Sequence, residues 1–174
     1  MSALITCSVA PITKIDMESN DFKISATFQK RLNDYIAEQD CKKSELPALI
    51  GINKDVFIRA ANLGILPSTR SIQKIADYFN ASFDYLIGLT DKDIFIKSAS
   101  PVSFGQRLDE LKHEKKVTFG KIATALGFSR SLFNSWTKNN YLPTVEIAFS
   151  LSQYFNVTID FLLGRSERKN FSYP

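Results

Sequence analysis

The sequence contains few of the residues from which metal centres and disulfide frameworks are built. Among its 174 residues there are two cysteines, Cys7 and Cys41, and one histidine. These are too few for a four-ligand structural zinc site, and two cysteines do not make a disulfide framework. A glycine-rich phosphate loop is also missing. We therefore expect no metal, no cofactor and no enzymatic activity.

Long apolar stretches are missing as well. No run approaches the roughly 20 apolar residues that cross a bilayer. The segment from Met1 to Ala10 lacks the basic start and the apolar centre of a secretion signal. We expect a cytoplasmic protein with no membrane partner. In that reducing setting Cys41 is interpreted as a small core hydrophobe rather than half of a disulfide bridge.

The charge balance is only weakly basic, with a formal net charge of +4. Its distribution is uneven, because residues 26–90 carry eight Lys and Arg against seven Asp and Glu, whereas residues 101–174 carry ten against six. The second half of the chain is therefore the more cationic one. This distribution favours a polyanionic partner without requiring it.

What the chain does contain is an internal repeat with a shift of 76 residues and no gap. Fourteen residues recur in this way, namely Phe28, Arg31, Leu32, Glu38, Gly51, Phe57, Leu66, Pro67, Tyr78, Phe79, Asn80, Asp84, Leu86 and Gly88 as Phe104, Arg107, Leu108, Glu114, Gly127, Phe133, Leu142, Pro143, Tyr154, Phe155, Asn156, Asp160, Leu162 and Gly164. The repeat predicts two small units rather than one large domain. We divide the chain into an arm (1–25), a first unit (26–90), a linker (91–100), a second unit (101–166) and a tail (167–174).

Capping residues in the second unit predict helix after helix. Ser103 and Gln106 form a capping-box pattern, Thr118 precedes a short helix that Gly127 ends, and Ser129 is the expected N-cap of a third helix that buries Trp136. A fourth helix begins near Thr144 and a fifth near Thr158. The first unit shows the same order, with Asn53 capping its third helix and Ser44 capping a second helix shortened by Pro47. The predicted fold is all-α, with two tandem five-helix units.

A short helix, a glycine turn and a third helix with a polar outer face describe a helix-turn-helix. The segments 126–131, 141–144 and 154–164 of the second unit resemble the XRE family of lambda-repressor-like regulators. The resemblance covers residues 26–90 and 101–166. It implies a DNA-binding transcriptional regulator, expected to be a repressor of prophage or bacterial type, whose third helix lies in the major groove of double-stranded DNA.

The resemblance assigns roles to the polar residues of both units. The base-reading candidates are Arg130, Ser131, Asn134 and Ser135 in the second unit and Lys54, Asp55, Ile58 and Arg59 in the first. The phosphate candidates are Thr118, Lys121, Lys138, Asn139 and Thr144 in the second unit and Lys42, Lys43 and Asn62 in the first. The second unit is the better reader, since a carboxylate at position 55 is repelled by phosphates, although it can accept from cytosine N4.

Several alternatives stay open at this stage. The strand-prone segments 3–9 and 22–25 predict an extended arm that pairs with the linker around Ile94–Lys97, or with another subunit. Tyr85 and Phe161 belong either to the core or to an interface, and the basic run from Arg165 to Lys169 is interpreted as a solvated tail. Either the two units of one chain bind two half-sites of different sequence, or one unit binds DNA while the other forms the contact between two chains of a homodimer. The alternative function is a protein-interaction module on the same scaffold.

Overall fold

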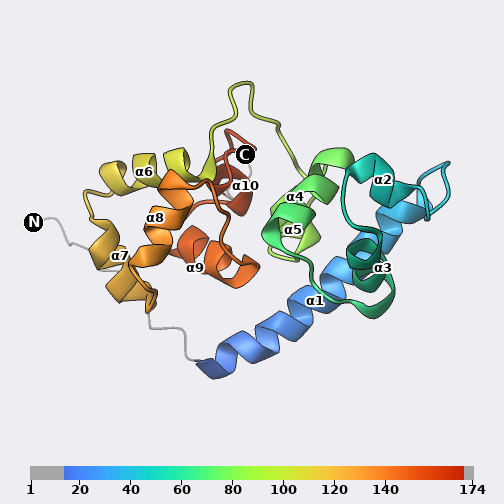
Figure 1. Ribbon diagram of the computed structural model, residues 1–174, viewed down its shortest axis with the longest axis horizontal. Coiled ribbons are helices and arrows are strands. Elements are labelled where there is room, and N and C mark those ends of the chain that lie inside the picture. Colours follow the sequence, from blue (N-terminus) through green and yellow to red (C-terminus); the bar gives the residue numbers. More distant parts are fainter. Residues whose placement is uncertain (1–13, 171–174) are drawn as a thin grey trace, which may run out of the picture.

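The computed structural model describes residues 14–170, with side chains from residue 24 onward, and this part of the chain is all-α. Figure 1 shows its helices in two groups that are joined by an arching linker. The first group consists of α1 (Lys14–Ala37), α2 (Leu46–Ile50), α3 (Lys54–Leu63), α4 (Thr69–Tyr78) and α5 (Phe83–Leu86). The second consists of α6 (Phe104–Glu114), α7 (Phe119–Leu126), α8 (Ser131–Lys138), α9 (Val145–Phe155) and α10 (Ile159–Leu162). The all-α class predicted from the sequence is confirmed for these residues.

Local capping explains where most of these helices begin. Ser103 accepts from the backbone N–H of Gln106, whose side chain accepts in turn from the N–H of Ser103. Thr118, Thr144 and Asn53 cap α7, α9 and α3 through their side-chain oxygens, as expected. Each of these oxygens satisfies an amide that the first turn of a helix leaves without a partner.

Two predicted caps are wrong, and both precede a helix of a helix-turn-helix pair. Helix α8 begins at Ser131, and its N-cap position is occupied by Arg130 without a side-chain cap. Ser129 does not reach a backbone amide, because its hydroxyl bonds the hydroxyl of Ser131 at 2.7 Å. In the first group Glu45, not Ser44, precedes α2, which is shorter than α7 and keeps its proline within the first turn.

Helix α1 is much longer than its counterpart α6, with 24 residues against 11. Residues 22–25, predicted to be strand-like, lie inside this helix, so that prediction is wrong. A weak alternation over four residues cannot be distinguished from one helical turn, and the helix continues without a break into the segment around Phe28. The strand-prone segment 3–9 lies outside the described residues.

The core of each group consists of large apolar side chains that are removed from water. Phe28 and Leu32 of α1 pack with Phe57 of α3, and Phe104 and Leu108 of α6 occupy the equivalent positions. Trp136 is buried, as predicted, with its ring 5.8 Å from that of Phe104 and 4.9 Å from that of Phe133. Burial of side chains of this size stabilises a helix by about 1.5–3 kcal/mol per residue. This core holds the third helix of each group against the first.

The two groups meet through α5 and α10, which pack against each other at the centre of the molecule (Figure 1). Phe161 is buried beneath the guanidinium of Arg107, whose carbon lies 4.0 Å from the ring centroid, and Tyr85 lies beneath Arg31 at the same distance. The last helices therefore form a contact within the chain. The further division into two independent domains stays a prediction.

The linker and the segment after α10 also join the two groups. Lys97 forms an isolated antiparallel bridge with Ser166, and the amide of Ser98 donates to the carbonyl of Arg165 at 2.8 Å. The linker thus pairs with the C-terminal segment, where the sequence analysis expected the arm. The interpretation of Arg165 as part of a solvated tail is wrong, because its side chain is 3% exposed and pairs with Asp77 and Asp160.

Candidate nucleic-acid interface

The outer edge of α8 is polar and open to solvent. Arg130, Ser131 and Asn134 are exposed, and Ser135 is half-buried. The opposite edge of the helix carries Phe133 and Trp136 and packs into the core. The amphipathic pattern therefore turns the four predicted base-reading residues of the second group away from the core. Arg130, Ser131 and Asn134 are left uncovered by the described part of the chain.

Arg130 and Asn134 also line an open cleft of about 560 Å³ between α8 and the corner that joins α6 to α7. Lys112, Lys116 and Thr118 lie along the same cleft. Phe119 forms part of its floor by stacking on Phe133, with ring centroids 4.9 Å apart. The cleft brings cations, an amide side chain and the N-terminus of α7 together, which is a favourable setting for anionic groups.

The remaining phosphate candidates of the second group lie at helix ends or on exposed surfaces. Lys121 is exposed on α7, Lys138 is the exposed last residue of α8, and Asn139 follows it at the C-cap. The hydroxyl of Thr144 accepts from the backbone N–H of Ile147 at 3.4 Å. That hydroxyl is therefore already engaged in capping α9, while its residue stays exposed.

The equivalent edge of α3 is less suited to a polyanion. Lys54, Asp55 and Arg59 are exposed, and Ile58 is half-buried at the position that Asn134 occupies in the second group. Asp55 has its backbone N–H bonded to the cap Asn53 at 2.8 Å, while its carboxylate stays on the exposed surface. The acidic and the apolar side chain make the two third helices chemically different.

The phosphate candidates of the first group are partly engaged with one another. The ammonium of Lys43 donates to the side-chain oxygen of Asn62 at 2.7 Å and approaches that of Asn33 at 3.5 Å. Lys42 is exposed at the start of the segment that leads into α2. Lys43 and Asn62 are therefore neighbours, whereas the sequence showed them 19 residues apart.

Large apolar side chains are exposed near the end of α3. Leu63 is 68% exposed, and Ile65 just after the helix is 41% exposed. The equivalent positions of the second group are Asn139 and Tyr141. Tyr141 is itself 61% exposed, so the two groups differ here mainly in Leu63, which stands where the second group has Asn139.

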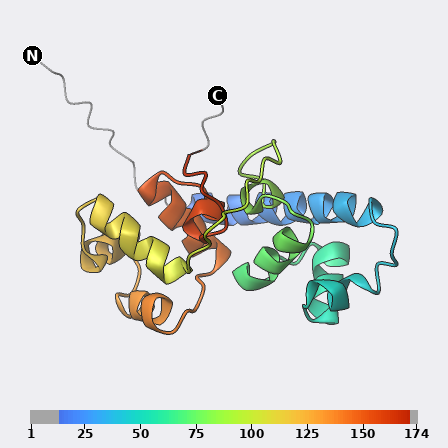
Figure 2. The ribbon, with the colours of Figure 1, turned by 90° about the horizontal axis from the view of Figure 1, so that it is seen from above.

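Helices α3 and α8 lie on the same side of the molecule, one toward each end, as Figure 2 shows from above. Between them, the segments that lead into α4 and α9 approach each other along a groove of about 460 Å³. There Thr69 donates its hydroxyl proton to the carbonyl of Pro143 at 2.6 Å, and Arg70 donates to the carbonyl of Asn140 at 3.2 Å. The linker lies on the opposite side.

Some residues of this surface were not identified from the sequence. Lys112 and Lys116 are brought into the cleft by the fold, although a basic end of a helix is usually explained by its dipole. Two further residues, Asp84 and Asp160, are buried between the two groups and do not belong to this surface. Their recurrence in the repeat is visible in the sequence, but their role depends on contacts between the groups.

Among the described residues, no helix has the length and apolar character needed to cross a membrane.

A stretch of 66 residues of the chain is similar to part of a known transcription regulator. Over 66 residues the chain is 32% identical to the HTH-type transcriptional activator BcrR of Enterococcus faecalis, which is 38% of this chain and 32% of that protein. The chain thus spans about a third of the length of this relative. No family model matches the sequence, and no solved structure matches it. Part of the chain is therefore similar to a helix-turn-helix transcription regulator.

Proposed function

We propose that the protein is a sequence-specific DNA-binding transcription regulator of the lambda-repressor-like XRE type, built from two tandem helix-turn-helix units. It binds DNA in the cytoplasm and catalyses no reaction. The observation that carries the proposal is the uncovered polar edge of α8, with Arg130 and Asn134 beside a cleft rich in cations. The partial similarity to a helix-turn-helix activator supports the same class of protein.

The side chains on α8 have the chemistry that base reading requires. An α-helix fits the major groove, where arginine pairs with the O6 and N7 of guanine and asparagine with the N6 and N7 of adenine. We assign these contacts to Arg130 and Asn134, with Ser131 and Ser135 beside them. Lys116 and the N-terminus of α7 then face backbone phosphates, which fix the position of the helix. The ammonium of Lys112 is already paired with Asp109 at 2.5 Å.

The position of α3 on the same side of the molecule allows one chain to contact two half-sites. Because Asp55 and Ile58 replace the serine and the asparagine of α8, the two half-sites have different sequences. Ile58 suits the methyl group of thymine, and Asp55 suits the amino group of cytosine. The preferred duplex is therefore not a palindrome, unlike the sites of symmetric dimers.

Selection of bound duplexes from a random pool tests this proposal. On the selected site, Arg130→Ala and Asn134→Ala each weaken binding by about 1–3 kcal/mol, or roughly fivefold to 150-fold, and relax the preference at one base pair. The control is Lys97→Ala, which removes a cation from the linker on the opposite side. If selection enriches no sequence, or if the control weakens binding as much as the two variants, the proposal is wrong.

A second function is favoured by one observation in the first group. Leu63 at the end of α3 and Ile65 just after it are exposed, and Ile58 lies half-buried on the same helix. These apolar side chains suit contact with a protein surface better than contact with phosphates. In that case Ile58→Asn leaves the DNA preference unchanged. If α3 reads DNA, the same substitution changes the preferred base at one position, and repeating the selection with this variant distinguishes the two outcomes.

A further inference from the structure

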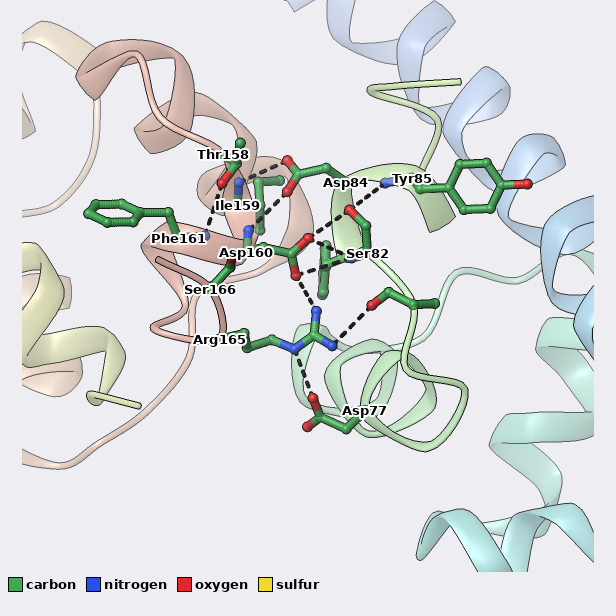
Figure 3. A network of polar contacts seen from close by, with 12 residues as sticks. Asp77, Ser82, Asp84, Tyr85, Thr158, Ile159, Asp160, Phe161, Arg165 and Ser166 are labelled. Atoms are coloured by element: carbon green, nitrogen blue, oxygen red, sulfur yellow. Dashed lines mark hydrogen bonds and ion pairs between the residues drawn. The ribbon is translucent and has the colours of Figure 1, made fainter. Parts of the chain in front are cut away.

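The junction between α5 and α10 is made of two carboxylates that cap each other's helix (Figure 3). Asp84 of α5 accepts from the backbone N–H of Ile159 at 2.8 Å and from that of Asp160 at 2.9 Å. Asp160 of α10 accepts in return from the N–H of Phe83 at 2.9 Å and from the hydroxyl of Ser82 at 2.7 Å. Both aspartates are buried and occupy equivalent positions in the repeat. The two groups are therefore joined with approximate twofold symmetry.

Arg165 breaks this symmetry, since the equivalent position of the first group is Leu89. Its guanidinium pairs with Asp160, donates to Asp77 at 2.9 Å and donates to the carbonyl of Ala81 at 3.2 Å. It also stacks on Phe95 of the linker, 4.4 Å from the ring centroid. One buried side chain thus joins α4, the turn before α5 and α10 (Figure 3), and it contacts the linker as well.

A buried guanidinium with this set of partners holds its surroundings in one geometry. Arginine is planar and presents its donors in fixed directions, so each acceptor must keep its place. Removal of the guanidinium would leave Asp160 as a buried carboxylate without its cation, which is strongly unfavourable. Sliding or rotation of one group against the other would break these bonds together with the reciprocal caps of Asp84 and Asp160.

In each group, a single helix connects the junction to the third helix by packing against both. In the first group α5 packs on α1, and α1 packs on α3. In the second group α10 packs on α6, and α6 packs on α8. The helices α1 and α6 are the longest members of these two connections. A rotation at the junction is therefore transmitted to the relative position of α3 and α8.

We propose that Arg165, Asp84 and Asp160 are positioning residues that fix the separation and rotation of the two third helices. The protein then accepts two half-sites only at one spacing. This inference rests on the proposed function and extends it to the architecture of the DNA site. Helices that read successive major-groove faces on one side of a duplex lie about 34–36 Å apart, or about 10–10.5 base pairs. A rigid junction rejects other spacings, because a changed spacing also rotates the second half-site around the duplex.

The test measures affinity for a series of duplexes in which the selected half-sites are separated by spacers that differ by one base pair. For the wild-type protein, a change of about two base pairs from the optimum weakens binding by about tenfold or more, since the second half-site loses its contacts. Arg165→Met flattens this dependence to about threefold or less while affinity for a single half-site is unchanged. The control is Lys97→Met, which removes an exposed cation of the linker beside the same segment; it keeps the wild-type dependence.

A second variant covers the case in which Arg165→Met does not fold, as judged by circular dichroism. Asp77→Ala removes the half-exposed carboxylate that accepts from the guanidinium, and it leaves the buried bond to Asp160 in place. It is expected to broaden the spacing dependence to an intermediate degree. A folded Arg165→Met or Asp77→Ala protein with the wild-type spacing profile overturns the inference.

A measurement without DNA separates failure of this inference from failure of the proposed function. Spin labels at the equivalent exposed positions Asp55→Cys and Ser131→Cys, in a Cys7→Ser and Cys41→Ser background, report the separation of α3 and α8. We expect one narrow distance distribution that Arg165→Met broadens and Lys97→Met does not. A distribution that Arg165→Met leaves narrow overturns the inference. If no DNA sequence is selected but Arg165→Met broadens the distribution, the rigid junction stands and the DNA-binding function fails.

Discussion

At the scale of single residues, Gly164 illustrates how closely the end of the repeat packs. It follows α10 with a φ of 72°, in the left-handed region. A Cβ at this position would overlap the backbone carbonyl of Val102, which precedes α6. Glycine is therefore required twice, by the backbone conformation and by the approach of a neighbouring main chain. Gly127 has nearly the same φ of 70°, but a Cβ there would meet no atom within 4 Å.

This difference predicts unequal costs for the same substitution. Gly127→Ala is expected to lower the free energy of unfolding by about 1–2 kcal/mol, the cost of a left-handed alanine. Gly164→Ala adds the displacement of a backbone segment and is expected to cost about 1–3 kcal/mol more. Urea denaturation monitored by the fluorescence of Trp136 measures both values. Equal losses of unfolding free energy for the two variants would contradict this prediction, because they would show that the segment before α6 moves aside at no cost.

At the scale of elements, α5 and α10 are single turns, too short to be stable without contacts outside themselves. Their first amides are satisfied by the carboxylate of the opposite group, so neither turn is complete alone. Burial, and then the nearby charge of Asp160, raise the pKa of Asp84 well above its ordinary value. Arg165, which pairs with Asp160, is the cation in this cluster, and Asp77 lies on its far side.

The raised pKa of Asp84 gives a pH dependence of definite sign. A carboxyl whose pKa is higher in the folded state than in the unfolded state stabilises the fold while it is protonated in both. That contribution is lost as the pH rises from about 4, where the unfolded chain ionises, through the raised value. Denaturation at about pH 4.5 to about pH 7.5 should therefore show a fall in stability that Asp84→Asn removes. Parallel curves for the two proteins would contradict this, since all other titrating groups are shared.

The helix starts show which parts of the fold are predictable from the sequence. Ser103, Thr118 and Thr144 were identified as caps because a cap depends on residues within one turn. Ser129 was misassigned since its hydroxyl has a competing partner two residues away, and no local rule decides between the two. The third helix and its exposed polar edge were still placed correctly, because apolar spacing fixes which side is buried.

The junction was not predictable for a different reason. The bonds from Arg165 to Asp77 and to the carbonyl of Ala81 span 88 and 84 residues. In the sequence Arg165 begins a short basic run, which usually lies on the surface. Only the packing of α10 against α5 brings its partners into place. The repeated aspartates were visible, but nothing in the repeat indicated that each would cap the other's helix.

At the scale of the whole molecule, the two third helices lie on one side and the linker on the other. The side with α8 carries the cations of the cleft, while the edge of α3 mixes cations with Asp55 and Ile58. Electrostatic attraction to DNA is therefore expected to come mainly from the second group. Phosphate contacts release condensed counterions, so they are measured by the salt dependence of binding.

Lys121 of α7 provides a test of this expectation. Lys121→Ala should weaken binding to every sequence by a similar factor and lower the slope of log affinity against log salt by about one. Fluorescence anisotropy of a labelled duplex at increasing KCl gives the slope. A loss that is confined to the selected sequence, with the slope unchanged, would mean that Lys121 contacts a base and no phosphate.

The junction within the chain also bears on how such a regulator would respond to its own abundance. When two subunits must associate before they bind, and most of the protein is dissociated, the occupancy of a promoter rises with the square of the subunit concentration. Two readers joined by a linker and held by buried bonds require no such encounter. Promoter occupancy would then rise with the first power of the number of molecules in the cell, giving a graded dose response with a Hill coefficient of about one.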